Sequence, residues 1–163
     1  MLQWREALGT VSVIAALTMG CASRDSRAFV EFLNSGKVLP RNLPFSEAVR
    51  VGNILFLSGQ IGVVPGSGTL VPGGIRAEAH QTMENIKTVL EAHGYALADV
   101  VKCTVMLADI TDWPDFNEVY RTYFVPPYPA RSAMAASGLA LGARVEVECI
   151  AAKRGVPRKK GME

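Results

Sequence analysis

One arginine and one glutamate near the C-terminal end, Arg131 and Glu148, are the residues most clearly suited to chemistry. Arg131 begins a segment of small residues, 131–136, whereas Glu146 and Glu148 alternate with apolar residues in segment 145–151. Such alternation predicts a β-strand whose carboxylates share one face. If the two segments pair as antiparallel strands across a turn at 138–142, Arg131 lies beside Glu148. A guanidinium binds a carboxylate bidentately and a glutamate holds water, so the pair could bind a small carboxylic acid and hydrate the adjacent carbon.

An exposed ion pair is the simpler interpretation of Arg131 and Glu148. Cross-strand pairs of this kind contribute roughly 0.2–1 kcal/mol to stability and need no function. On these two residues alone, the structural interpretation is favoured.

Length and composition indicate one domain. The chain has 163 residues, of which 49% are hydrophobic and 20% charged, so it can bury a sizeable core. The net charge is only +2 and aromatic residues make up 7%. Nucleic acid is therefore not an expected partner, because no basic surface interleaved with aromatics is present. The basic residues of 156–163 are interpreted as a tail outside the domain.

The cysteines and histidines give no metal motif. The chain has three cysteines, at positions 21, 103 and 149. An odd number of widely spaced cysteines predicts neither a disulfide framework nor a zinc site. Cys103 and Cys149 are expected to be small buried side chains on strands. His80 and His93 have no cysteine or carboxylate at ligand spacing, so they are assigned to helix surfaces or edges. No metal and no cofactor are expected.

The N-terminal segment differs from the rest of the chain. Residues 7–19 carry no charge and follow Arg5, but the run is shorter than the ~20 residues that span a bilayer. This pattern is typical of a secretory signal, and residues 17–21 resemble a lipoprotein signal in which Cys21 would carry lipid. A retained apolar helix or a misplaced start codon are the alternatives. We predict a leader at 1–26, a domain at 27–155, and a periplasmic or lipid-anchored location; without a real leader, the location is cytoplasmic.

Within the domain, the patterns predict a hairpin, two helices and three further strands. Residues 27–44 are weakly patterned, and the glycine-rich loop at 65–74 lacks any phosphate-binding motif. The predicted elements are a hairpin at 48–61 turning at Gly52 and Asn53, a helix at 75–93, a strand at 101–107, a helix from about 112 to 124, and strands at 131–136 and 145–151.

These elements predict an α+β fold with two helices on one face of a mixed sheet. The opposite face is expected to carry Ala133, Ala135, Glu146 and Glu148. Its small residues favour cover by another subunit, which would put Arg131 and Glu148 at subunit boundaries.

Several short motifs in a shared order make the chain similar to the Rid (YjgF) family of reactive intermediate deaminases. The resemblance covers about residues 43–154. It rests on Pro-Phe-Ser-Glu-Ala-Val at 44–49, Val-Gly-Asn at 51–53, Phe-Leu-Ser-Gly-Gln-Ile-Gly at 56–62, Asn-Ile at 85–86, Asn-Glu-Val-Tyr at 117–120, Pro-Ala-Arg-Ser at 129–132 and Val-Glu-Val-Glu at 145–148.

The resemblance implies a chorismate-mutase-like subunit and a homotrimer with clefts between subunits. It also implies cofactor-free hydrolysis of enamines and imines, such as 2-aminoacrylate, to 2-keto acids and ammonia. Arg131 would hold the substrate carboxylate and Glu148 would position the attacking water, which reverses the preference for a plain ion pair. The remaining residues expected in the cleft are Asn117, Ser58, Gly59, Phe45 and Ala133.

Two residues depart from the family pattern. Phe45 stands where tyrosine is usual, and Ala133 stands where many members have cysteine. These changes, together with an exported location, count against 2-aminoacrylate as the best substrate rather than against imine hydrolysis. A non-catalytic trimer that binds small ligands is the alternative. An endoribonuclease is less favoured, because the sequence offers neither a basic aromatic surface nor a His/Lys pair.

Overall fold

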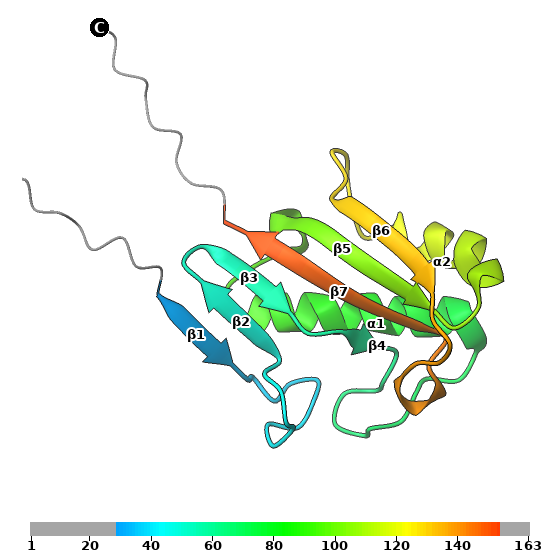
Figure 1. The fold of residues 1–163 in the computed structure, drawn as a ribbon, viewed down its shortest axis with the longest axis horizontal. Coiled ribbons are helices and arrows are strands. Elements are labelled where there is room, and N and C mark those ends of the chain that lie inside the picture. Colours follow the sequence, from blue (N-terminus) through cyan, green and yellow to red (C-terminus); the bar gives the residue numbers. More distant parts are fainter. Residues whose placement is uncertain (1–28, 154–163) are drawn as a thin grey trace, which may run out of the picture.

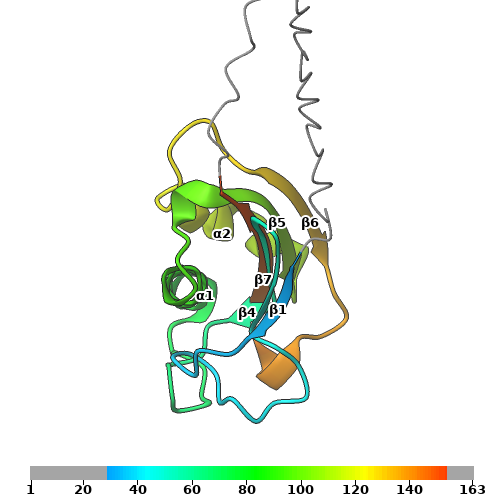
Figure 2. The same cartoon turned by 90° about the vertical axis from the view of Figure 1, so that its left-hand side faces the viewer.

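The protein folds as one mixed sheet covered on one face by two helices (Figures 1 and 2). The computed structural model describes residues 29–153. The strand order is β1-β2-β3-β7-β5-β6, and the short β4 also pairs with β7. The predicted α+β class with both helices on one face is confirmed. The elements are β1 (Val30–Leu33), β2 (Ala48–Val51), β3 (Ile54–Leu57), β4 (Gln60–Ile61), α1 (Gly74–Ala92), β5 (Val100–Leu107), α2 (Trp113–Tyr120), β6 (Ala130–Ala135) and β7 (Val145–Ala152).

The N-terminal part of the sheet is a three-stranded meander. β2 and β3 form the predicted hairpin, which turns at Gly52 with a φ of 59°, a conformation that favours glycine. β1 pairs antiparallel with β2, although its segment was expected to be only a weakly patterned lead-in. That expectation was wrong because four alternating residues are too few to give a clear periodic signal.

The helices bury the apolar stripes that the sequence predicts. α1 buries Ala79, Met83, Ile86 and Leu90 against the sheet, and Gly94 follows it with a φ of 81°. α2 ends at Tyr120 rather than near residue 124, because the amides of Thr122 and Tyr123 bond to carbonyls three residues back, as in turns. The core therefore lies between the helices and one face of the sheet.

The two strands that carry Arg131 and Glu148 are not neighbours. β6 pairs in parallel with β5, and β7 pairs antiparallel with the other edge of β5. The predicted antiparallel pairing of 131–136 with 145–151 is therefore wrong. α2 connects β5 to β6 as a helical crossover, which makes these strands parallel, and β7 then fills the gap between β3 and β5.

A disulfide joins Cys103 on β5 to Cys149 on β7. The two residues face each other in the ladder, their side chains are 0% and 2% exposed, and their Cα atoms lie 4.1 Å apart. The expectation of two free buried thiols was wrong, because sequence spacing does not reveal that the strands bring them together.

Removing this disulfide is expected to destabilise the fold. A cross-link across 46 residues restricts the unfolded chain, and such cross-links contribute about 2–4 kcal/mol. The double variant Cys103→Ala/Cys149→Ala should lose that much free energy of unfolding in a urea titration. The wild type, unfolded and refolded under reducing conditions, should show a similar loss, and an unchanged midpoint in both samples contradicts the prediction.

No helix or strand within residues 29–153 covers the sheet face opposite α1 and α2, and the N-terminal half of this face is largely apolar. Phe32 and Phe56 are 73% and 43% exposed there, and Val49 and Ile150 pair with them in register. Glu146 and Glu148 lie on this face as predicted. Ala133 and Ala135 do not, because their register partners Val105 and Leu107 are buried on the helix side.

None of the helices within residues 29–153 is long and apolar enough to cross a membrane. The predicted leader, Cys21 and the basic tail at 156–163 lie outside the described residues.

Candidate functional site

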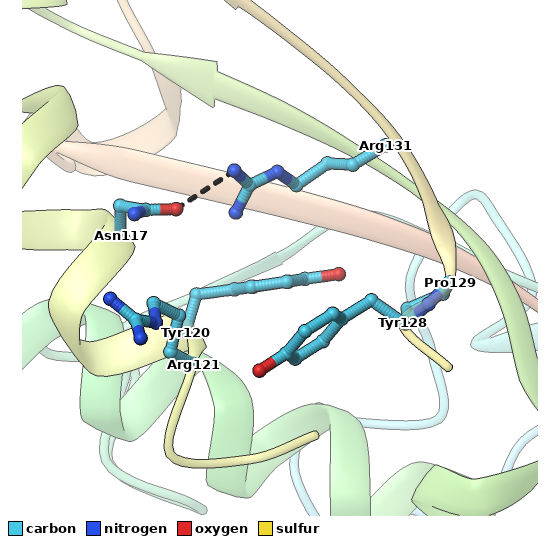
Figure 3. Close-up of a pocket in the computed structure, with 6 residues that line it drawn as sticks. All are labelled: Asn117, Tyr120, Arg121, Tyr128, Pro129 and Arg131. Carbon is cyan, nitrogen blue, oxygen red and sulfur yellow. Dashed lines mark hydrogen bonds between the residues drawn. The ribbon is translucent and has the colours of Figure 1, made fainter. Parts of the chain in front are cut away.

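Arg131 is held rigidly on the helix side of the sheet by α2. Its register partner on β5 is the buried Cys103, which fixes the direction of its side chain. The guanidinium carbon lies 4.5 Å from the ring centres of both Trp113 and Tyr120, and Nη2 donates to Asn117 Oδ1 at 2.8 Å (Figure 3). Stacking and hydrogen bonding together fix the plane of the guanidinium.

Beside this guanidinium lies a pocket of about 500 Å³, here called the arginine pocket. Arg131 Nη1 and the Tyr120 hydroxyl are buried at this site and make no hydrogen bond to other described residues. Burial raises the pKa of Tyr120, so its hydroxyl stays protonated. Two buried donors without partners, one of them cationic, form an anchor for a carboxylate. The pocket is lined by Asn117, Tyr120, Arg121, Tyr128, Pro129 and Arg131.

Glu146 forms a second site on the opposite face of the sheet. It lines a pocket of about 460 Å³, here called the glutamate pocket, together with Phe45 and Gly59. A Cβ atom at position 59 would overlap the Glu146 carboxylate, so a larger residue there would displace that side chain. Ser58 donates its hydroxyl to the carbonyl of Ser46 at 2.7 Å, which ties this turn to the Phe45 segment.

The environment of Glu146 favours its protonated form. Burial raises the pKa of Glu146, and the negative charge of Glu148 raises it further. A carboxyl group whose pKa is raised towards the working pH is suited to accept and return a proton.

An irregularity in the ladder brings Gly59 against Glu146. Phe56 pairs with Ile150, but Gln60 pairs with Val147, so the β3–β4 segment contains one more residue than the β7 segment opposite. This extra residue is a bulge at Ser58 and Gly59, a device often found beside active sites. Because Glu146 and Glu148 share one face, strand periodicity could not distinguish them, and the sequence interpretation missed Glu146.

The structure does not bring Arg131 and Glu148 together within one chain. Glu148 lies on the open face, where it lines a small pocket of about 190 Å³ with Lys102 and Thr104. Ala133 lies beside Trp113 in a further shallow pocket. Of the residues expected in one cleft, Arg131 and Asn117 line the arginine pocket, and Phe45 and Gly59 line the glutamate pocket. Glu148, Ala133 and Ser58 line neither of these two pockets.

A buried contact between a carboxylate and a histidine follows the Phe45 segment. Glu47, which follows Phe45 and Ser46, lies 3.0 Å from His93 Nε2, and the two side chains are 4% and 9% exposed. Ser35 donates to both oxygens of Glu47, whose backbone carbonyl accepts from the amide of Ser58. His93 was expected on a helix edge; the fold instead supplies a carboxylate that sequence spacing could not reveal.

No group of three or more histidine, cysteine or acidic side chains within residues 29–153 is arranged to hold a metal ion. The two pockets offer two arginines, a carboxylate and neutral hydrogen-bonding groups.

The family model described as Endoribonuclease L-PSP matches residues 37–153. The chain belongs to the Rid (YjgF) family. A 2-iminobutanoate/2-iminopropanoate deaminase from Bos taurus is 48% identical over 108 residues, which cover 66% of this chain and 79% of that protein. The Homo sapiens protein of the same name is 45% identical over the same shares.

Solved structures of Rid family proteins share the fold. RidA from an Antarctic Psychrobacter superposes with a TM-score of 0.71 at 39% identity, covering 76% of this chain and 99% of that one. TdcF from E. coli, solved with bound serine, gives a TM-score of 0.70 at 30% identity over the same shares. Both pockets therefore lie on the fold of the Rid family, and relatives of this chain in that family include named deaminases.

Proposed function

We propose that the chain hydrolyses 2-imino acids, and the enamines that tautomerise to them, to 2-keto acids and ammonia. The observation that carries this proposal is the partly buried Arg131 guanidinium, whose buried Nη1 has no hydrogen-bond partner within residues 29–153 and lies beside an open pocket. A carboxylate is the natural occupant of that position. The named activity of relatives at 45–48% identity supplies the reaction class.

The reaction requires a bound carboxylate, a placed water and one proton carrier. Arg131 holds the carboxylate of the imino acid, while Asn117, Trp113 and Tyr120 hold Arg131. Glu146 accepts a proton as water adds to C2 of the protonated imine, which gives a carbinolamine. The same proton passes to the nitrogen, and Glu146 takes the hydroxyl proton as the C–N bond breaks, the carbonyl forms and ammonia leaves; Glu146 then gives that proton to ammonia or to water.

We assign the water-placing role to Glu146 rather than Glu148. Glu146 lies in the larger pocket, against Gly59 and Phe45, and its pKa is raised. Glu148 lies away from these residues, in the small pocket with Lys102. Its charge acts on Glu146 from the neighbouring position on the same face.

We further propose a homotrimer in which the arginine pocket of one subunit meets the glutamate pocket of the next. Within one chain the two pockets are on opposite faces of the sheet, so neither pocket contains both the carboxylate anchor Arg131 and the proton acceptor Glu146. The exposed Phe32 and Phe56 on the open face favour burial against another copy. A cyclic trimer would combine both pockets at each of three boundaries.

Replacing Arg131 tests the deaminase assignment. Arg131→Ala removes the carboxylate anchor, so kcat/KM for keto acid release should fall by about a hundredfold or more. Imino acids generated by an amino acid oxidase serve as substrates, and keto acid is measured with a dehydrogenase. Lys37→Ala, an exposed charge away from both pockets, is the matched control.

The outcomes separate an enzyme from a binding protein. Wild-type turnover that Arg131→Ala abolishes supports the deaminase. Binding of 2-keto acids without any turnover by the wild type would instead favour a non-catalytic sensor. The matching family description names an endoribonuclease, so RNA cleavage by the same preparation is measured alongside. RNA cleavage whose rate does not change when keto acid is added would contradict the deaminase proposal.

We propose that the protein is exported, as a cleaved or lipid-anchored form with Cys21 as the candidate acylation site. The leader pattern in residues 1–26 is one support. The Cys103–Cys149 disulfide is a second, because such bonds persist mainly in oxidising compartments. Mass spectrometry of the mature N-terminus tests the proposal, and a full-length cytoplasmic protein overturns it.

A further inference from the structure

The glutamate pocket is more apolar than the hydration of a small imino acid requires. Its walls come from the loop before β2, from β4 and from the turn that precedes β7. Among the described residues that line it, Glu146 is the only one with a charged side chain. The apolar walls are formed by Leu39, Pro40, Leu43, Phe45, Ile61 and Leu141.

Leu141 is the unusual wall residue. Its φ is 57°, so a branched side chain occupies the left-handed region, where glycine or asparagine is normally found. The side chain is 67% exposed and makes no contribution to the core. A strained residue kept at the edge of a pocket indicates a role in that pocket.

Phe45 adds to the apolar character. Its ring is 48% exposed and carries no hydroxyl group, so it offers a bound molecule a surface without a hydrogen-bond donor. A polar substrate side chain placed there would lose its hydration without gaining a partner, whereas an apolar one would gain from burial.

We infer that this chain selects 2-imino acids with large apolar side chains, such as those derived from leucine, methionine or phenylalanine. The inference rests on the proposed deaminase function and names its substrate class. With the substrate carboxylate held by Arg131 of an adjoining subunit and C2 beside Glu146, the side chain of the substrate enters the apolar part of the pocket.

The test compares imino acids generated from alanine and from leucine. Each buried methylene favours binding by a factor of several, so kcat/KM for the leucine-derived imine should exceed that for the alanine-derived imine by at least about tenfold. Leu141→Asn keeps a residue that tolerates positive φ but makes the wall polar, and should lower this ratio severalfold. Val125→Asn, at an exposed position outside both pockets, should keep the wild-type ratio.

A binding measurement makes the test independent of turnover. Calorimetry with 4-methyl-2-oxopentanoate and with pyruvate should show tighter binding of the larger keto acid, and Leu43→Asn should reduce the difference if Leu141→Asn does not fold. Equal or reversed preferences in both assays, with turnover intact, overturn the substrate class and leave the deaminase function standing. Absence of any imine hydrolysis overturns both.

Discussion

Glu146→Gln is expected to lower kcat by about 10²–10⁴-fold, the usual contribution of a positioned acid–base group. The amide preserves the shape of the side chain but cannot accept a proton from water. KM should change little, because Arg131 still anchors the carboxylate. Steady-state kinetics with oxidase-generated imino acids measure the effect.

Glu148→Gln is the matched control, since it removes the same charge two residues along the same strand face. It should retain turnover but shift the acidic limb of the pH profile. The charge of Glu148 helps to raise the pKa of Glu146, and activity requires the ionised form, so removing that charge should move the limb to lower pH. If Glu148→Gln abolishes turnover while Glu146→Gln does not, the two assignments are exchanged.

The raised pKa of Glu146 also predicts that Glu146→Gln, which lowers activity, increases the stability of the fold at neutral pH. A carboxyl group whose folded pKa is raised stabilises the fold below its unfolded pKa and loses that contribution as the pH rises through the folded pKa. Ionised Glu146 therefore opposes folding at neutral pH, and Glu146→Gln should unfold at a slightly higher urea concentration than the wild type. The gain should disappear below pH 4.

Mixing two inactive variants should restore activity if each site is shared between subunits. Arg131→Ala lacks the carboxylate anchor, and Glu146→Gln lacks the proton acceptor. In randomly mixed oligomers at equal ratio, roughly one quarter of the boundaries combine an intact Arg131 with an intact Glu146. About a quarter of the wild-type rate should therefore appear after the two variants are co-expressed or unfolded and refolded together.

Simple mixing without subunit exchange should give no activity, which controls for residual turnover by either variant. The double variant Arg131→Ala/Glu146→Gln, mixed with the wild type, shows whether an inactive subunit lowers the activity of its neighbours. It contributes neither an intact Arg131 nor an intact Glu146 to a boundary with a wild-type subunit. If co-expressed single variants remain inactive while forming stable mixed oligomers, the shared site is contradicted. Sedimentation should then decide whether a trimer exists at all.

The local elements were determined by the sequence. Apolar residues at three- and four-residue spacing placed α1, and the Gly52 turn placed the β2–β3 hairpin. Alternation along β7 placed Glu146 and Glu148 on one face. The ordered motifs also indicated the Rid family, which the comparisons confirmed. These features depend on interactions between residues close in the chain, so periodicity reports them directly.

Only the tertiary structure decided which strands are neighbours and therefore which side chains meet. The crossover through α2 places β6 parallel to β5 and separates Arg131 from Glu148. The ladder between β5 and β7 joins Cys103 to Cys149, and the bulge at Ser58 and Gly59 selects Glu146. Each outcome depends on pairing between segments far apart in the chain. A shift of one residue in such pairing changes the side chains that meet without changing the local pattern, so the sequence carried no signal for it.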